Sequence, residues 1–462
     1  MDTNNFLDDV ASLMSKQLES FSGYQDQQKE IYDGRRAPLS LGISLSPELD
    51  AKIRTKLSWG TVSVDYLSNQ LNFDILLNDE WGINELFNYG QADNAINSAI
   101  KNSIIASCSF VSVTPGNTSV GEPPVVYTVY SGSEATGIFN NRTGKLDFGL
   151  AIEKMENDKV VSWLVFAPDA TYRWDGENFT KINDSKYGCQ LVLFAYCQDI
   201  ATKPFGVSRN DSAQREAIDS AIRVLKRLEI SSEFYATPQR YLFTNGEEGL
   251  SNLESLNSKI GQILHLNNGE SETDSPTFGS IDAASPEPFI DAFNLYAQQF
   301  AAAALMDPQE FGISPANGSL SSDAEDRRAK KMVDLTNRVK KIYDFSVKQL
   351  AFHSASIVGI PITGDMFKLS ATWVNSIGSV SDIGKIGDAL GKLFESVPEL
   401  AKTDIAYELL GISKRGRLDN IDAIKVDPMA EFNGFSDELK QIIMENAKAQ
   451  IDEFKDLDGP NV

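Results

Sequence analysis

The sequence predicts an α+β protein, and three patterns support this fold class. Apolar residues recur at steps of three and four over residues 6–22, 212–234, 286–306 and a long stretch from 322, which is helical periodicity. Between about 104 and 193, short β-prone runs are separated by turn dipeptides, as in antiparallel sheets. Strands and helices do not alternate one by one, so nothing favours a parallel sheet of βαβ units.

Local patterns place the elements of the first half. The first helix is expected to end at the Ser22-Gly23 break, and a second short helix is expected around 51–59. Residues 61–73 alternate like a strand or a strand-to-helix passage, and helix returns over 83–100. The expected strands are 104–113, 124–130, 146–152, 160–166 and 190–194, with turns at Gly116-Asn117, Asn140-Asn141 and Asn157-Asp158.

The second half is expected to be mainly helical, with a small insertion between two helices. The helix at 212–234 follows a weak capping signal, and residues 247–287 then carry eight acidic side chains against Lys259 alone. This insertion has one expected strand at 262–266. Pro286 takes the favoured first position of the next helix. That helix carries an aromatic stripe that we assign to core or subunit packing: Phe289, Phe293, Tyr296 and Phe300.

The longest expected helix starts at a capping box of Ser322 and Glu325 and runs for thirty residues or more. It is the basic stretch of an acidic chain, with eight Lys and Arg against five Asp and Glu. A strand at 366–373 follows, then short helices over 381–410 and a C-terminal helix near 436–454.

The charge balance excludes several classes of function. The 65 acidic and 42 basic residues give a net charge of −23, which argues against tight binding to nucleic acid through neutralised phosphates. The mean hydropathy is −0.24 and no apolar run reaches 18 residues, so no membrane span is expected. The first residues lack a basic and apolar leader, and we expect synthesis and use in a cytosol.

Residues that could bind a metal or a cofactor are scarce. Cys108, Cys189 and Cys197 are too irregularly spaced for a zinc cluster or a disulfide framework, and we expect them to be buried apolar residues. His265 lies in a strand-like run and His353 late in a helix, so they do not suggest a joint site. No Gly-rich phosphate loop is present. The sequence therefore predicts no cofactor and no metal, and it singles out no catalytic group.

Several segments resemble one protein family in their residues and in their order. Residues 233–241 combine a helix-ending acid, an aromatic residue, Pro-Gln-Arg and a second aromatic residue. This run is similar to one in the portal proteins of tailed bacteriophages, the ring-shaped connectors at one capsid vertex. Weaker similarities lie at Tyr32-Asp33-Gly34-Arg35, at Trp59 with Val64-Asp65 and 71–73, at 314–330 and at 379–411. The resemblance covers about 30–420, and the stretch 113–132 departs from it.

The resemblance implies a portal fold and a division of the chain. The parts would be a wing at 1–210, a first stem helix at 211–235, a clip at 236–285, a second stem helix at 286–307, a tunnel loop at 308–321, a long helix and wing strand at 322–378, and a crown with a tail at 379–462. We expect contacts between subunits along the stem helices and along the long helix after Ser322, with Ile222 and Phe293 among the contact residues of the stem.

The implied function is structural rather than enzymatic. A homo-oligomeric ring, expected to be a dodecamer, would sit at the portal vertex of a virion after assembly in the host cytoplasm. It would conduct double-stranded DNA without sequence specificity during packaging and ejection. Its implied partners are the terminase large subunit, the major capsid and scaffolding proteins, and head-tail adaptor proteins.

Three groups of residues would carry this function if the resemblance holds. The channel loop would contain Pro308, Gly312, Pro315, Asn317 and Gly318, and the motor contact would contain Arg240, Tyr241, Glu247 and Glu248, next to Tyr235. The basic residues Arg327, Arg328, Lys330 and Lys331 would lie near the channel or at a subunit contact. The other interpretation of this basic set is a solvated helix face balanced by its own acids at i,i+4.

Simple geometry supports a ring. Twelve helices of about 10 Å diameter, set side by side, enclose a circle of roughly 38 Å between centres and a bore of roughly 28 Å, wide enough for a DNA duplex. An acidic wall repels phosphate over about 8–10 Å and lets DNA slide.

Two other classes of function remain open from the sequence. The chain could be an acidic hydrolase that uses a carboxylate pair, either Asp147 with Glu153 or Asp169 with Asp175. It could also be another capsid or tail-adaptor protein, which would share the acidic, cofactor-free composition. A hydrolase should be a monomer or a small oligomer, whereas a portal should form rings of about a dozen subunits.

Overall fold

The computed structural model describes residues 3–37, 53, 55–156, 159–236, 240–244, 263–267, 277–280, 285–313, 322–374 and 392. The chain divides into two compact units, Met1–Ala371 and Thr372–Val462. All helices and strands described below belong to the first unit, except that the strand Ser370–Val374 continues past Ala371 into the second unit. Among the described residues, no helix combines the length and the apolar character that crossing a bilayer requires.

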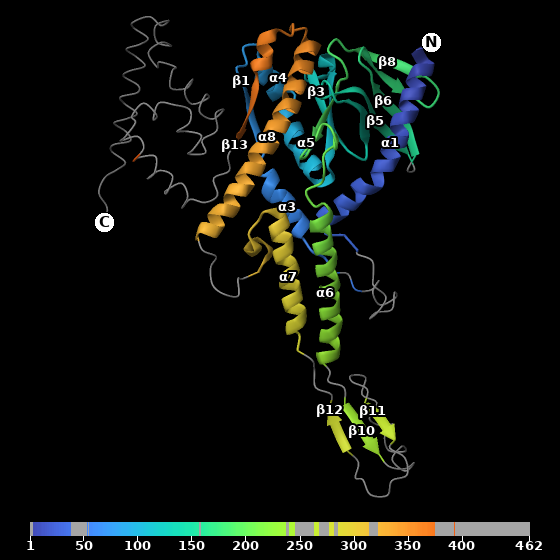
Figure 1. Cartoon of the computed structure of the whole chain (residues 1–462). Helices are drawn as coiled ribbons and strands as arrows, with labels where there is room; N and C mark the ends of the chain where they lie inside the picture. The colour runs from blue at the N-terminus through green and yellow to red at the C-terminus, as the bar shows by residue number, and fades with distance from the viewer. Residues whose placement is uncertain are drawn as a thin grey trace, which may run out of the picture. The chain divides into compact units, whose positions relative to one another are not determined.

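A three-stranded antiparallel sheet, in the order β3-β2-β9, lies at the centre of the first unit. Its strands are β2 (Cys108–Pro115), β3 (Val125–Ser131) and β9 (Leu191–Ala195). Helices α5 (Ala92–Ala106) and α8 (Ser322–Val358) cover one of its faces (Figure 1). Ser109 Oγ donates to the Ala99 carbonyl of α5 at 2.6 Å, and the rings of Phe194 and Tyr343 are 6.0 Å apart.

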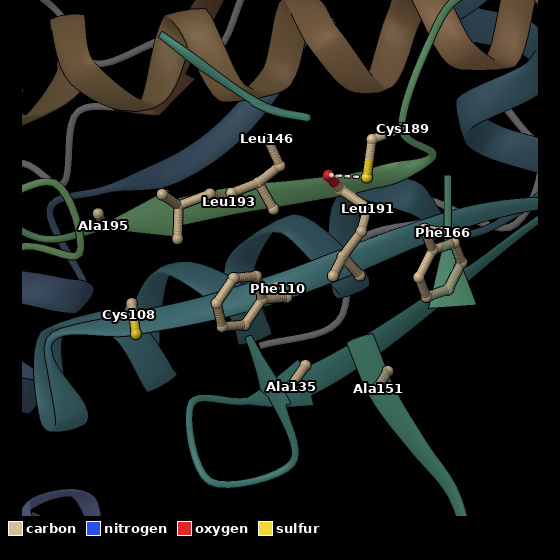
Figure 2. Packing of buried hydrophobic residues seen from close by; sticks show 10 residues of the cluster. All are labelled: Cys108, Phe110, Ala135, Leu146, Ala151, Phe166, Cys189, Leu191, Leu193 and Ala195. Atoms are coloured by element: carbon tan, nitrogen blue, oxygen red, sulfur yellow. Dashed lines mark hydrogen bonds between the residues drawn. The ribbon is translucent and has the colours of Figure 1, made fainter. Parts of the chain in front are cut away.

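A five-stranded antiparallel meander packs against the other face of this sheet. Its strands are β4 (Ala135–Asn140), β5 (Lys145–Glu156), β6 (Lys159–Phe166), β7 (Ala170–Trp174) and β8 (Phe179–Asp184), paired in sequence order. Phe110 and Leu191 from the first sheet meet Phe166 from the second in a buried cluster, as Figure 2 shows. Helix α1 (Thr3–Tyr32) covers the opposite face of the meander, where Leu7 and Met14 pack with Leu150 and Val165. We call this stack of α5 and α8, two sheets and α1 the layered region.

Smaller elements complete the layered region. They are α3 (Trp59–Ser68), α4 (Ile83–Tyr89), the 3-10 turns η1 (Thr118–Val120) and η5 (Gly364–Lys368), and the two-stranded sheet of β1 (Asn72–Leu77) and β13 (Ser370–Val374). Gly90, just after α4, allows a close approach of β3. A Cβ at this position would lie 2.7 Å from the Val125 carbonyl oxygen, so a larger residue would push the strand away.

Two long helices lie side by side outside the layers, and we call them the helical hairpin (Figure 1). They are α6 (Ser212–Ala236) and α7 (Glu287–Ala304), and the turn η4 (Pro308–Phe311) follows α7. The chain between them forms a sheet in the order β11-β10-β12, from β10 (Arg240–Thr244), β11 (Ile263–Asn267) and β12 (Thr277–Ser280). Its β10–β11 pair is parallel, and β10–β12 is antiparallel.

The structure confirms the α+β class, the antiparallel sheets of the first half and the three long helices of the second half. The first helix is longer than expected, because α1 continues through Gly23 to Tyr32. Gln25, Gln28 and Ile31 are fully buried beyond this glycine. Packing of these three residues outweighs the roughly 1 kcal/mol by which glycine disfavours a helix interior.

The prediction for residues 51–73 is wrong in part. Trp59 begins α3 instead of ending a helix, and residues 61–68 are helical, not extended. The buried positions of α3 are Trp59, Gly60, Ser63, Val64 and Leu67, which follow helical spacing. The helical period could not be recognised in the sequence, because the buried residues Gly60 and Ser63 are small and do not count as apolar positions in a hydrophobic pattern.

Other boundaries also shift. The helix expected at 83–100 is two helices, divided at Gly90 and at Gln91, whose φ is 52°. Residues 104–106 belong to α5 rather than to a strand, and the strand expected from 366 begins at Ser370 after η5. Strands β4, β7 and β8 were not predicted, since their mixed polar composition gives little alternation. The helices expected at 381–410 and 436–454 lie outside the described residues.

Candidate assembly site

An aromatic cluster fixes the helical hairpin to the layered region. Trp59, at the start of α3, is only 4% exposed. Its ring centroid is 5.2 Å from that of Phe293, 5.5 Å from that of Phe300 and 6.1 Å from that of Phe311. These distances are typical of favourable aromatic pairs. Phe293 and Phe300 of the stripe therefore pack against Trp59 within one chain, whereas Phe293 keeps part of its surface exposed and the subunit contact expected there stays a prediction.

Polar bonds close the base of the hairpin where α6 begins and α7 ends. Buried Arg209 donates to the Ala304 carbonyl and, at 3.3 Å, to the Tyr196 hydroxyl. Gln214 donates to the Ala303 carbonyl at 3.1 Å. The guanidinium at the C-terminus of α7 meets the negative end of the helix dipole, which stabilises the buried charge.

A bidentate ion pair connects the chain after α1 to the middle of α6. Arg36 donates from Nε and from one terminal nitrogen to the two carboxylate oxygens of Asp219, both at 3.0 Å. The side chains are 21% and 17% exposed, so water screens the pair only partly. This hydrogen bond is the main cause that raises the pKa of Arg36.

Helix α7 carries two large apolar side chains that remain about half exposed. Its inward face consists of Ala297, Phe300, Ala301 and Ala304, all buried. Ile290, seven residues before Ala297, continues this inward side and is 45% exposed, whereas Leu295 lies on the opposite side of the helix and is 53% exposed. Ile222 of α6, by contrast, is 2% exposed within the single chain, so the expected subunit contact at Ile222 is wrong. We define the side of α7 that carries Leu295 as its outer face and take it as the candidate assembly site.

The segment expected to form a channel loop begins as a well-packed turn. Pro308 lies in η4, which Asp307 caps by accepting a hydrogen bond from the Gln309 amide at 2.9 Å. Phe311 is buried against Trp59, and Gly312 ends the turn with a φ of 79°. Pro315, Asn317 and Gly318 lie outside the described residues.

Two of the residues expected at a motor contact lie in the central strand of the small sheet. Arg240 and Tyr241 begin β10, where their backbones pair with Ile263 and Leu264 of β11. Tyr235 belongs to the last turn of α6. Glu247 and Glu248 lie outside the described residues.

The basic residues of the long helix lie in its first turns. Arg327 and Arg328 belong to α8, and Lys330 and Lys331 are exposed on it. Further along, Lys348 pairs with Asp344 at i,i+4 and 2.8 Å. Both side chains are mostly covered, and Asp344 also accepts the Ala371 amide of β13, so this part of the helix is packed rather than solvated.

The two carboxylate pairs weighed for a hydrolase do not form sites. Asp147 and Glu153 lie six residues apart on β5, and Asp169 and Asp175 flank β7. At about 3.3 Å per residue, a strand separates each pair by about 20 Å. Glycoside hydrolases need about 5–10 Å between their carboxyl groups. Glu153 is moreover paired with Arg173.

The cysteines and the described histidine are inert at neutral pH. Burial raises the pKa of Cys108 and of Cys189 to about 12, whereas Cys197 is only half-buried. Burial, with help from Lys145, lowers the pKa of His353 to about 3, so this imidazole is neutral. In the described part of the chain, no three His, Cys, Asp or Glu residues gather as metal ligands.

Comparison with solved structures finds chains of gene transfer agent (GTA) particles. A chain of the virion of a native GTA particle has 11% identity and a TM-score of 0.44, over 83% of this chain and 98% of its own. A chain of the native GTA neck, computed with C12 symmetry, has 12% identity and a TM-score of 0.41, over 77% and 89%. A chain of the empty-particle neck, computed with C6 symmetry, has 12% identity and a TM-score of 0.42, over 77% and 90%. No family model and no curated protein matches the sequence.

Sequence reasoning missed the residues that hold the hairpin in place. Arg36, Asp219 and Arg209 form long-range contacts that no local pattern reveals. Ile290 and Leu295 could have been found, since both are large apolar residues of α7 that lie outside its aromatic stripe.

Proposed function

We propose that this chain is the subunit of a portal-type ring that conducts double-stranded DNA through a capsid vertex. The observation that carries the proposal is the succession of α6, a small three-stranded sheet, α7, η4 and the long α8 within one chain. This order is the one that the resemblance of the sequence implies. In this proposal, α6 and α7 are the stem helices, the small sheet belongs to the clip, and the layered region is the wing.

The outer face of α7 supports ring formation. Fully burying a large aliphatic side chain contributes about 1.5–3 kcal/mol, and Leu295 on this face has about half of its surface left to bury. Each subunit of a ring repeats the same contact with the next one, so a modest contribution recurs around the whole assembly.

The charge of the chain agrees with passage of DNA rather than with its retention. A net charge of −23 per subunit, repeated around a ring, repels phosphate. We propose weak, salt-sensitive and sequence-independent contact with DNA, and docking of the packaging ATPase and of adaptor proteins on the clip. A sequence-specific, submicromolar DNA complex at physiological salt would contradict this proposal.

The particle mass of the purified chain in solution, with negative-stain images, tests the proposal. We expect rings of about a dozen subunits. Leu295→Asp should dissociate them, because burying an unpaired carboxylate in an apolar contact costs several kcal/mol. Ile200→Asp is the matched control, since Ile200 is similarly exposed at 48% but belongs to the segment between β9 and α6 rather than to α7, and its rings should persist.

Two results would contradict the proposed function. The first is a wild-type chain that remains monomeric or dimeric at all concentrations. The second is a Leu295→Asp variant whose rings are as stable as those of the wild type, which would remove α7 from the subunit contact.

A further inference from the structure

A pocket of about 230 Å³ opens between α1 and the outer face of the five-stranded sheet. Three aromatic side chains and three polar ones from two sides line most of it: Trp163, Trp174, Phe179, Asp8, Ser12 and Ser15. The proposed ring function uses none of these residues. The volume is below the roughly 300–1,000 Å³ of pockets for drug-sized ligands, and it suits a single side chain.

Strand register aligns the aromatic side chains in one row. Trp163 of β6 lies directly opposite Trp174 of β7, and Trp174 lies directly opposite Phe179 of β8. Directly paired residues of neighbouring strands point to the same face of the sheet. The row therefore presents adjoining aromatic surfaces toward α1, and all three side chains remain partly exposed.

The polar side of the pocket selects a cation. Asp8 supplies a carboxylate, and the hydroxyls of Ser12 and Ser15 can accept hydrogen bonds, while no basic residue lines the pocket. Aromatic faces attract ammonium and guanidinium groups within about 6 Å. Lysine and arginine combine such a head with an apolar stem, and the stem suits the aromatic row.

We propose that this pocket receives a lysine or arginine side chain from α8 of a neighbouring copy of the chain. Helices α1 and α8 form the two outer layers of the layered region, on opposite sides of its sheets. The exposed face of α8 is basic and includes Lys330, Lys331, Arg338 and Lys341. A ring of identical subunits joins unlike faces head to tail, so an acidic aromatic pocket can meet a basic helix at every contact. This inference rests on the proposed ring.

Charge reversal in full-length chains tests the pocket, with particle mass against protein concentration as the readout. Asp8→Lys should raise the concentration for half-maximal assembly at least tenfold. Asp9→Lys is the matched control, because Asp9 is equally exposed on α1 but does not line the pocket, and it should change assembly less than twofold. Trp174→Leu should weaken assembly in the same direction as Asp8→Lys.

Single Asp substitutions at the four basic positions of α8 identify the donor. One of these α8 variants should lose assembly to the same extent as Asp8→Lys. Combining that α8 substitution with Asp8→Lys should restore assembly, because the ion pair then forms with its charges exchanged. Circular dichroism of each variant verifies that it is folded.

The result separates this inference from the proposed function. If Leu295→Asp dissociates the rings while Asp8→Lys assembles like Asp9→Lys, the ring stands and the pocket inference is overturned. Loss of assembly in Asp8→Lys that no α8 reversal restores overturns α8 as the donor. A wild-type chain that forms no ring overturns both proposals.

Discussion

The layered region and the helical hairpin bury their apolar surfaces in different ways. In the layered region, each main sheet is covered on both faces, by a second sheet and by helices, so that Phe110, Phe166 and Phe194 are fully buried. The hairpin buries one face of α7 and leaves Ile290 and Leu295 exposed. The comparison teaches that the two-sided layers bury most of their apolar surface within one chain, whereas a two-helix hairpin leaves part of its apolar surface exposed.

The junction between the two regions consists of a few strong contacts. The cluster around Trp59 and the Arg36–Asp219 pair connect α6 and α7 to the layers. The hairpin should therefore keep its position in an isolated subunit, and assembly should use a surface that is already formed. Each prediction below affects one side of this comparison.

Phe300→Ala should have the largest effect, on folding. Phe300 is fully buried against Trp59 and Phe311, and its truncation should lower the free energy of unfolding by about 3–5 kcal/mol. Leu295→Ala, on the exposed face of the same helix, should change the unfolding of the dissociated subunit by less than about 0.5 kcal/mol, yet weaken the ring. Chemical denaturation and particle mass measure the two effects. Equal losses of folding stability would contradict the division of α7 into an inner and an outer face.

His353 should make the layered region sensitive to acid. Its pKa is about 3 in the folded chain, against an ordinary value of 6.5, because burial and Lys145 disfavour the charged form. The unfolded chain then binds more protons than the folded one between pH 6.5 and 3. Stability is therefore full above pH 6.5 and decreases as the pH falls, by up to about 1.4 kcal/mol per pH unit.

The variant His353→Gln measures this contribution, because it removes the titrating group. Between pH 6.5 and 5.5, where ordinary carboxylates change little, the free energy of unfolding should decrease less steeply in the variant than in the wild type. Identical slopes would show that His353 is not held neutral.

Arg36→Lys should change stability less than Phe300→Ala or the titration of His353, and its effect should be confined to the junction between the two regions. Lysine keeps the charge but cannot form the two parallel hydrogen bonds to Asp219, and we expect a loss of about 1 kcal/mol. Hydrogen exchange should show faster opening of α6 with little change in the β2 and β9 amides. The exposed Arg35, whose partner Asp33 is a near neighbour in sequence, provides the control substitution Arg35→Lys. Faster exchange throughout the sheets would mean that the two regions unfold as one.

Part of the candidate site could be predicted from the sequence. The periodicity of 286–306 predicts α7 and its aromatic stripe, but only packing decides that Phe293 and Phe300 meet Trp59, more than 200 residues earlier in the chain. Apolar residues on two sides of α7 look alike in sequence. The structure separates the side that faces α3 and α6 from the side that remains exposed.

The pocket beside α1 could be predicted from the sequence even less than the inner and outer faces of α7. Trp163, Trp174 and Phe179 lie on three strands, of which β7 and β8 were not predicted. Their alignment depends on strand register, and register results from pairing across the sheet rather than from the order of residues within one strand.

The sequence by itself determined the α+β class and the order of the main segments: a first helix, a region of antiparallel strands, two amphipathic helices around a small acidic insertion, and then a long basic helix. These features follow from local periodicity, proline, glycine and charge, which act over a few residues. Only the tertiary structure decided that α1 continues past Gly23, that Trp59 begins a helix, and that Ile290 and Leu295 remain exposed. Those outcomes depend on contacts between distant residues, whose free energy exceeds the local preferences of roughly 1 kcal/mol per residue.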